Sequence, residues 1–286
     1  MRSLGAGMRL LMSVARYRIQ RGILSGPKAN SGDVKPIVSR IRERSYVVVP
    51  EYLSRTTCDE IISDVDRLIQ RFPDCIQVDA VGADHRIFGS QHGAKAIMAF
   101  HNDQYALEIG HAYCGSPIVN FSTLAARLEA RPGNAGSGQG WHRDRQPQQF
   151  KAIVYLTDVT HDNGPFQIIP GSHRTFRKLI DAVRADLDPN TTRLSDAEVE
   201  RILANSSYEL DTITGKAGSM ILVDTSAIHR GMPIFEGTRY ALTNYYYFPD
   251  EVAGREEKFP PMLTLDRVLG DASSCEKSIG NQNGVM

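Results

Sequence analysis

The sequence predicts a mainly β domain, a sandwich or barrel of short strands with helices packed around it. From about residue 118, short β-rich runs alternate with Gly, Pro and Asn turns, a texture typical of all-β sandwiches and barrels. Amphipathic helical patterns precede and interrupt these runs. With 286 residues, 41% of them apolar, the chain is long enough to bury a substantial core.

The first 24 residues contain no acid, and their apolar residues recur at helical spacing. Steps of three and four place one set on a single helical face: Leu4, Met8, Leu11, Met12, Ala15, Ile19 and Ile23. Three interpretations stay open. The helix packs on its own body or a twin subunit, binds a membrane peripherally through residues 1–24, or is an Arg-rich organelle transit peptide. "GPKANSGD" (26–33) predicts a flexible break.

The expected body follows a basic amphipathic segment over residues 1–43. "SYVVVPEYL" predicts a short strand stopped by Pro50, and amphipathic helices are expected over 55–72 and 100–113. Further strands are expected within "FKAIVYLTDV", "PFQIIP", "SMILVDTSAIH" and "RYALTNYYYF". A helix at 194–206 interrupts them and opens on a Ser195–Glu198 capping box. We expect one domain over 44–250 and a polar extension over 251–286.

The charge balance excludes one class of partner. The chain carries 33 basic and 33 acidic residues, which argues against general electrostatic binding of nucleic acid. Residues 1–44 hold ten bases and two acids, a balance of +8. The other 23 bases and 31 acids give residues 45–286 a balance of −8. The N-terminal segment is therefore the basic part of an otherwise acidic chain.

Cysteine usage and hydropathy indicate the compartment. Four widely spaced cysteines without a Cys-x-x-Cys pair argue against a disulfide framework and favour a reducing compartment. No apolar run reaches the length of a membrane span, and no signal-peptide apolar region is present. We expect a cytoplasmic protein, membrane-associated if the first helix binds lipid, with organelle targeting as the alternative.

A His-x-Asp pattern occurs twice, at 101–103 and 142–144. Residues two apart face the same way only in extended chain, so the first copy, in a helical stretch, cannot easily share an ion. The second follows a Gly-rich turn and leads into β-type sequence. There His142 and Asp144 would face one side, with Arg143 and Arg145 on the other. We therefore take His142 and Asp144 as the candidate metal ligands.

A third ligand would complete this site, because two imidazoles and a carboxylate on one face suit ferrous iron and leave positions open. Downstream, His161 lies in a turn and His173 follows a Pro-Gly turn. His229 ends a strongly apolar β run, which is rigid enough to hold a ligand. Arg239 opens the next β run and carries a planar fork that matches a carboxylate, which points to an acidic co-substrate.

Two segments, "WHRDRQPQQFKAIVYLTDVTHDNGPFQIIPGSHR" and "GSMILVDTSAIHRGMPIFEGTRYALTNYYY", resemble the phytanoyl-CoA dioxygenase (PhyH-like) family of Fe(II)/2-oxoglutarate-dependent oxygenases. The resemblance covers residues 44–250 and implies a double-stranded β-helix (jelly-roll, cupin-like) core. It implies that His142, Asp144 and His229 bind iron and that Arg239 binds the distal carboxylate of 2-oxoglutarate. His173 resembles the family's recurrent turn histidine, which we interpret as structural.

The activity that the resemblance implies is a dioxygenase that uses Fe(II), 2-oxoglutarate and O₂. It would release succinate and CO₂ while hydroxylating a C–H bond of a small-molecule, lipid or glycan substrate. Chlorinating relatives lack the carboxylate present here as Asp144, which favours hydroxylation over halogenation. Desaturation, cyclisation and epimerisation stay open, as does a homo-oligomeric state. The alternative is a non-catalytic metal-binding jelly roll with a sensing or structural role.

The expected pocket departs from the family pattern at one position, and a separate segment is expected to contact substrate. Family members often carry a polar residue two positions after the distal histidine, where this chain has Gly231. Substrate contacts are expected from a loop over residues 80–100. Its polar and basic side chains lean toward a polar or anionic substrate: His85, Arg86, Gln91, His92 and Lys95.

Overall fold

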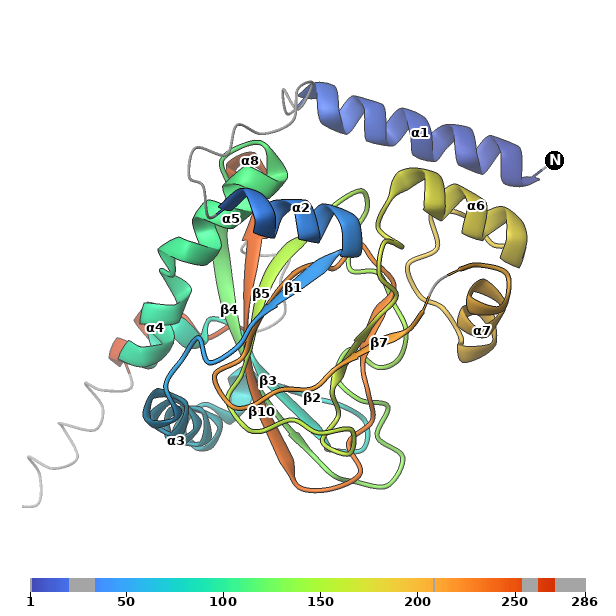
Figure 1. Cartoon of the computed structure of the whole chain (residues 1–286). Helices are drawn as coiled ribbons and strands as arrows, with labels where there is room; N and C mark the ends of the chain where they lie inside the picture. The colour runs from blue at the N-terminus through green and yellow to red at the C-terminus, as the bar shows by residue number, and fades with distance from the viewer. Residues whose placement is uncertain (1, 21–33, 208, 254–261, 271–286) are drawn as a thin grey trace, which may run out of the picture.

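The computed structural model describes residues 2–20, 34–207, 209–253 and 262–270, and its core is a pair of antiparallel sheets (Figure 1). The large sheet has seven strands in the order β1-β8-β5-β10-β4-β3-β2, and the small sheet has the order β7-β6-β9. The strands are β1 (Tyr46–Val49), β2 (Ile76–Val78), β3 (Asp84–Ile87), β4 (Val119–Glu129), β5 (Phe150–Tyr155), β6 (Phe166–Ile168), β7 (Asp211–Ile213), β8 (Met220–Asp224), β9 (His229–Gly231) and β10 (Thr238–Tyr247). The predicted double-stranded β-helix core is confirmed.

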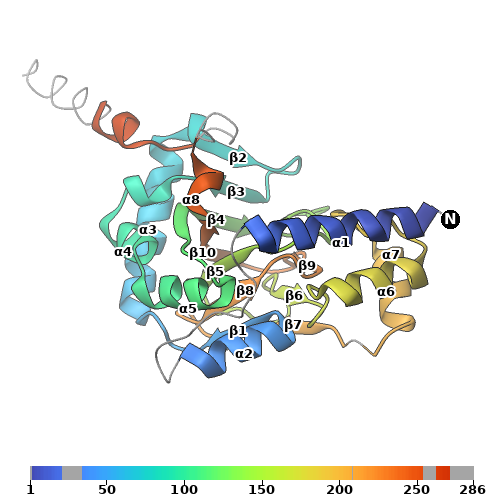
Figure 2. The same cartoon turned by 90° about the horizontal axis from the view of Figure 1, so that it is seen from above.

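Helices surround these sheets, as the sequence predicted. They are α1 (Arg2–Gln20), α2 (Val34–Arg44), α3 (Arg55–Arg71), α4 (Lys95–His101), α5 (Gln104–Cys114), α6 (Thr175–Ala185), α7 (Asp196–Ala204) and α8 (Pro249–Val252), with 3₁₀ turns η1 (Pro73–Cys75) and η2 (Ser90–His92). Helices α2 to α5 cover the outer face of the large sheet (Figures 1 and 2). Helices α6 and α7 lie on the side of the small sheet, and α1 runs along α6.

Strand β8 shows how the core is divided. All five of its residues are buried, because helices cover one face of the large sheet and the small sheet covers the other. Met220 and Leu222 pack toward the helices, whereas Ile221 and Val223 pack toward the small sheet. Each such side chain contributes about 1.5–3 kcal/mol when it leaves water. This two-sided burial explains why the strand reads as a continuous apolar run.

Most of the expected local elements are confirmed. The helix expected over 55–72 is α3, and it begins at the N-cap Ser54, whose Oγ accepts a hydrogen bond from the Thr57 amide. The helical insertion is α7, with the predicted capping box between Ser195 and Glu198 in place. The flexible break expected at 26–33 lies outside the described residues.

Three expectations about elements were wrong. The helix expected over 100–113 is two helices, because Asp103 leaves helical geometry and caps α5 by accepting from the Ala106 amide. The strand expected to end at His229 stops at Asp224, whose carboxylate accepts from the Ser226 amide and turns the chain toward the small sheet. Residues 80–100 are not a loop but contain β3, η2 and the start of α4.

The ends of the described chain pack against this body. Helix α2 buries Val34, Val38 and Ile41 in the same core as the large sheet. Leu263 is fully buried there too, and its amide donates to the carbonyl of Phe88. Among the described residues, the helices are too short or too polar to span a bilayer.

Candidate metal centre and carboxylate pocket

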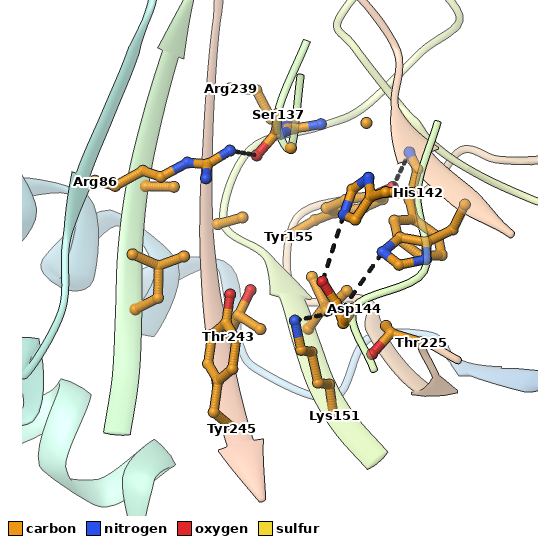
Figure 3. A pocket seen from close by; sticks show the side chains of 18 of the residues that line it. Arg86, Ser137, His142, Asp144, Lys151, Tyr155, Thr225, Arg239, Thr243 and Tyr245 are labelled. Carbon is orange, nitrogen blue, oxygen red and sulfur yellow. Dashed lines mark hydrogen bonds and ion pairs between the residues drawn. The ribbon is translucent and has the colours of Figure 1, made fainter. Parts of the chain in front are cut away.

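A cavity of about 180 Å³ lies between the two sheets, and the candidate ligands line it (Figure 3). The period-two alternation of the strands explains which side chains enter it. On β10, Arg239, Ala241, Thr243 and Tyr245 face the cavity, whereas the intervening Leu242 and Tyr246 pack toward the helices. Alternate residues of β5 face the cavity in the same way, namely Lys151, Ile153 and Tyr155.

Backbone pairing brings the two histidines together. The His142 amide donates to the His229 carbonyl and the His229 amide donates to the His142 carbonyl, both at 2.9 Å. Such a reciprocal pair places the two residues directly opposite each other. Two residues later, the Asp144 amide donates to the Thr225 carbonyl at 3.0 Å. Thus His229, which begins β9, meets the His-x-Asp segment through the backbone.

The three side chains converge on one point, and Figure 3 labels two of them, His142 and Asp144. One ligand atom from each of His142, Asp144 and His229 lies within 4.8 Å of the others. Nε2 of His142 is 3.4 Å from Oδ1 of Asp144, and Nε2 of His229 is 3.6 Å from Oδ2. Arg143 and Arg145 turn away, as expected, and bond to the Ser172 and Ser226 carbonyls and to Glu251.

Both imidazoles are held in the tautomer that a metal requires. Nδ1 of His142 donates to the Gly140 carbonyl at 2.8 Å, and Nδ1 of His229 donates to the Ala227 carbonyl at 3.0 Å. The proton is therefore on Nδ1, and each Nε2 directs a lone pair toward Asp144. Burial and the neighbouring His142 lower the pKa of His229 to about 3, so its ring is neutral at physiological pH. Two lone pairs and a carboxylate facing each other fit a divalent cation.

A buried lysine, which the sequence analysis did not single out, completes the electrostatics. Nζ of Lys151 lies 2.6 Å from Oδ2 of Asp144 and 3.9 Å from the centroid of the Tyr245 ring. Burial disfavours both charged forms, but the attraction between the two charges outweighs this cost. The pKa of Asp144 is therefore held well below its usual value, and that of Lys151 is raised. The carboxylate stays ionised, as a metal ligand must.

Arg239, on β10, lies at the end of the cavity away from Lys151. Its guanidinium does not use all of its hydrogen-bond donors. Nη1 donates to the carbonyl of Gly164, but Nε has no hydrogen-bond partner among the described residues although it is buried. Arg239 also forms no ion pair with a carboxylate in the described part of the chain, and burial lowers its pKa. A buried cation with an unused donor fits a carboxylate brought by a ligand.

Arg86 is a second guanidinium in the cavity, and its charge is already compensated. It pairs with Asp84 at 2.5 Å, and its Nη2 also donates to Oγ of Ser137 at 3.2 Å (Figure 3). Ser137 packs against Gly231, where an added Cβ would lie 2.9 Å from the Cβ of Ser137. Gly231 therefore leaves room for Ser137 beside the distal histidine, and the Gly231 amide donates to the Ser137 carbonyl at 2.9 Å.

The other candidates lie outside the cavity. His101 bonds to Thr123 and Asp103 caps α5, so the first His-x-Asp copy does not converge. His173 bonds through Nδ1 to Oγ of Ser45 at 2.7 Å, a contact that ties the turn to the end of α2. Of the five side chains expected to bind substrate between 80 and 100, only Arg86 lines the cavity.

The Gly-rich turn before His142 closes the cavity. Gly138 has a φ of +85°, and a Cβ there would lie 2.4 Å from Cε1 of His142. Only glycine allows the backbone to approach the ring this closely. Gly138→Ala should therefore displace His142.

A protein-family model and several known proteins are similar to this chain in sequence. Residues 41–234 match the family model described as phytanoyl-CoA dioxygenase (PhyH). An ectoine dioxygenase of Nocardia farcinica is 31% identical over 118 residues, which are 36% of this chain and 39% of that protein. An ectoine dioxygenase of Halomonas elongata is 22% identical over 228 residues, 72% of this chain and 67% of that one. The Nocardia match thus spans well under two thirds of that relative's length.

Two solved structures share the fold. The epimerase SnoN in complex with Fe³⁺, alpha-ketoglutarate and nogalamycin RO superposes with a TM-score of 0.59 at 18% identity. That match covers 82% of this chain and 97% of SnoN. EctD from S. alaskensis in its apoform gives a TM-score of 0.56 at 16% identity, over 74% of this chain and 75% of EctD. At these identities, the likeness shows the fold.

Proposed function

The chain belongs to the phytanoyl-CoA dioxygenase (PhyH) family, and from that premise we propose that it is an Fe(II)- and 2-oxoglutarate-dependent dioxygenase. The observation that carries the proposal is the convergence of His142, Asp144 and His229 within 4.8 Å, with each Nδ1 bonded to a backbone carbonyl so that each Nε2 faces the carboxylate. We propose these three residues as the iron ligands. Bound iron would supply the activation of O₂ that couples conversion of 2-oxoglutarate into succinate and CO₂ to substrate oxidation.

The residues of this chain would orient the co-substrate and exclude water. Arg239 would bind the distal carboxylate of 2-oxoglutarate, because its Nε is unpaired, whereas Arg86 is neutralised by Asp84. Lys151 holds one oxygen of Asp144 and so fixes the carboxylate beside the two imidazoles. Phe166, whose ring centroid is 5.3 Å from that of His229, and Ile153 line the cavity with apolar surface.

We propose hydroxylation of a C–H bond as the outcome, with a small-molecule, lipid or glycan substrate. One oxygen atom of O₂ would enter succinate and the other the hydroxylated product. The relatives' names support a small molecule, since they are ectoine dioxygenases. Desaturation, cyclisation and epimerisation start from the same C–H cleavage and stay alternatives, and the SnoN neighbour is named an epimerase.

A succinate-release assay tests the proposal. The purified chain, given Fe(II), 2-oxoglutarate and air, should form succinate slowly without substrate and faster with an accepted compound from a panel of small molecules, lipids and glycans. His229→Ala should abolish both rates, and His173→Ala should leave both unchanged. If metal binds but no succinate forms with any compound, the non-catalytic alternative is correct.

The remaining expectations stay predictions. None of the contacts among the described residues bears on a cytoplasmic location, on organelle targeting as its alternative or on a homo-oligomeric state. Peripheral membrane contact through residues 1–24 is also a prediction. The packing of α1 gives that last prediction a structural basis.

A further inference from the structure

Helix α1 leaves its apolar stripe exposed. It packs on the body through Leu10, which is 2% exposed, and through Tyr17, whose ring lies edge-on to that of Phe248. These residues are not the stripe that the sequence pattern singled out. Stripe residues Met8, Met12 and Ile19 are 57%, 65% and 64% exposed. Helix α1 therefore has two apolar sides, one packed on the protein and one exposed to solvent.

Helix α6 also exposes apolar side chains, and it buries charged ones. Its inward side carries Lys178 and Asp181, which are 4% and 3% exposed. Its outward side carries Phe176, Ile180 and Val183, which are 75%, 40% and 67% exposed. A surface helix of a globular protein normally shows the reverse arrangement. Covering this side would therefore remove apolar surface from water.

The two apolar sides lie on neighbouring helices and are together called the α1–α6 face here. Its apolar members are Met8, Leu11, Met12, Ile19, Phe176, Ile180 and Val183. They are seven of the thirteen exposed large apolar side chains in the described part of the chain. Figure 2 shows the two helices side by side, and a Cβ at Gly7 would lie 3.2 Å from Cδ2 of Leu179. An open groove of about 900 Å³, lined by Leu11, Val14 and Phe176, runs into this face.

The exposed charges that the two helices themselves carry have one sign. Arg9 and Arg16 are exposed on α1, and Arg184 is exposed on α6. No acidic residue occurs in α1, and the single acid of α6, Asp181, is on its buried side. An apolar face flanked by arginines complements a surface that is apolar and negatively charged.

We propose that the α1–α6 face docks on an anionic lipid bilayer. Its apolar side chains would enter the acyl boundary, and its arginines would contact lipid phosphates. A second copy of the chain fits the charges less well. A two-fold contact places the same patch on both subunits, so arginines would face arginines across it. Docking by both helices goes beyond a terminal anchor, because it brings the enzyme body against the membrane.

Vesicle co-sedimentation of the full chain tests this proposal without reference to activity. The chain should bind vesicles of phosphatidylcholine with phosphatidylglycerol, and binding to phosphatidylcholine alone should be far weaker. Met12→Glu and Phe176→Glu should each lower affinity more than about ten-fold, since they remove apolar burial and add repulsion. Phe235→Glu is the matched control, because Phe235 is 64% exposed at a distant loop and should bind unchanged.

The arginines provide a second arm that does not perturb packing. Each of Arg9→Gln and Arg16→Gln should weaken binding to the anionic vesicles roughly five-fold, and added salt should have the same direction of effect. The proposal is overturned if the intact chain ignores anionic vesicles. It is also overturned if Phe176→Glu binds like the intact chain, or if this substitution only dissociates a dimer seen by light scattering.

Discussion

The molecule buries two lysines to the same extent and treats them in opposite ways. Lys151, in the cavity, is 5% exposed, and Lys178, under α6, is 4% exposed. Lys151 pairs with the carboxylate of Asp144 at 2.6 Å, and its pKa is raised. Lys178 donates to Oε1 of Gln146 at 3.0 Å and to the Pro147 carbonyl at 3.3 Å, both neutral. Burial and the nearby Arg143 lower its pKa to about 7.

The difference shows that the partner, more than burial, decides whether an amine stays charged inside a protein. In the cavity the ion pair keeps the Asp144 carboxylate ionised, which its proposed role as a metal ligand requires. Beneath α6 the amine serves to hold a loop through hydrogen bonds. The outer sides of the two regions differ as well, since helices cover the sheet, whereas the apolar side of α6 is uncovered.

Breaking the charged pair should have the largest effect. Asp144→Ala leaves Lys151 as an unpaired buried charge, which should lower the free energy of unfolding of the metal-free chain by about 3–5 kcal/mol. The double variant Asp144→Ala/Lys151→Met should recover most of that loss. Denaturant unfolding at neutral pH measures both. Equal stability of the single variant and the intact chain would contradict the pairing.

Lys178, whose hydrogen-bond partners are neutral, should make the free energy of unfolding depend on pH. Between pH 7 and the usual lysine pKa of 10.5, the unfolded chain binds a proton at Lys178 that the folded chain does not. The free energy of unfolding should therefore rise with pH across this window, by up to a few kcal/mol relative to Lys178→Met. Below pH 7 the difference between the two proteins should be constant. A parallel pair of stability curves from pH 7 to 10 would show that Lys178 is charged when folded.

Arg239 has no carboxylate partner in the described part of the chain, so removing its charge should affect ligand binding more than folding. Arg239→Ala should weaken 2-oxoglutarate binding by about 10- to 100-fold, because a charge-assisted bond contributes about 1.5–3 kcal/mol. Calorimetric titration of the metal-loaded protein with 2-oxoglutarate measures this loss. Arg127→Ala, outside the cavity and paired with Asp66, is the control. Unchanged affinity in the Arg239 variant would assign the carboxylate to another residue.

The smallest effect is expected on the uncovered side of α6. Phe176→Ser should change the free energy of unfolding in solution by no more than about 0.5 kcal/mol, since the ring is 75% exposed. By contrast, Leu10→Ala on the packed side of α1 should cost about 2–5 kcal/mol wherever α1 unfolds with the body. Thermal or denaturant melts compare the two. A large loss for Phe176→Ser would mean that the ring has a partner in solution.

The mainly β class and the His142–Asp144 pair could be predicted because strand texture and the His-x-Asp spacing are local signals. The jelly-roll core rested on the family resemblance, and His229 rested on that resemblance together with a strand that in fact ends at Asp224. Lys151 was missed because a lysine between Phe150 and Ala152 reads as the solvent side of a strand. Only the fold brings Asp144 and Tyr245 beside it and makes it internal. The break between β8 and β9 was missed for a related reason, since "SMILVDTSAIH" is apolar on both sides of the turn at Asp224.

Helix α6 shows a different limit. This helix was not predicted, although Phe176, Leu179, Ile180 and Val183 stand at helical spacing, and the same spacing would bury the wrong side. Apolar periodicity reports which residues share a side and says nothing of what covers that side. The stripe of α1 illustrates the same point, because the residues that pack on the body are Leu10 and Tyr17.

The reciprocal backbone bonds between positions 142 and 229 have a consequence for how this scaffold can diversify. Main-chain pairing sets the two residues opposite each other, so their register makes few demands on neighbouring side chains beyond the turn at Gly138, where a Cβ would meet the His142 ring. Wall positions such as Leu124, Ala126 and Ile153 can therefore vary in size and polarity while the imidazoles keep their register. Those wall positions are therefore natural targets for a directed-evolution library.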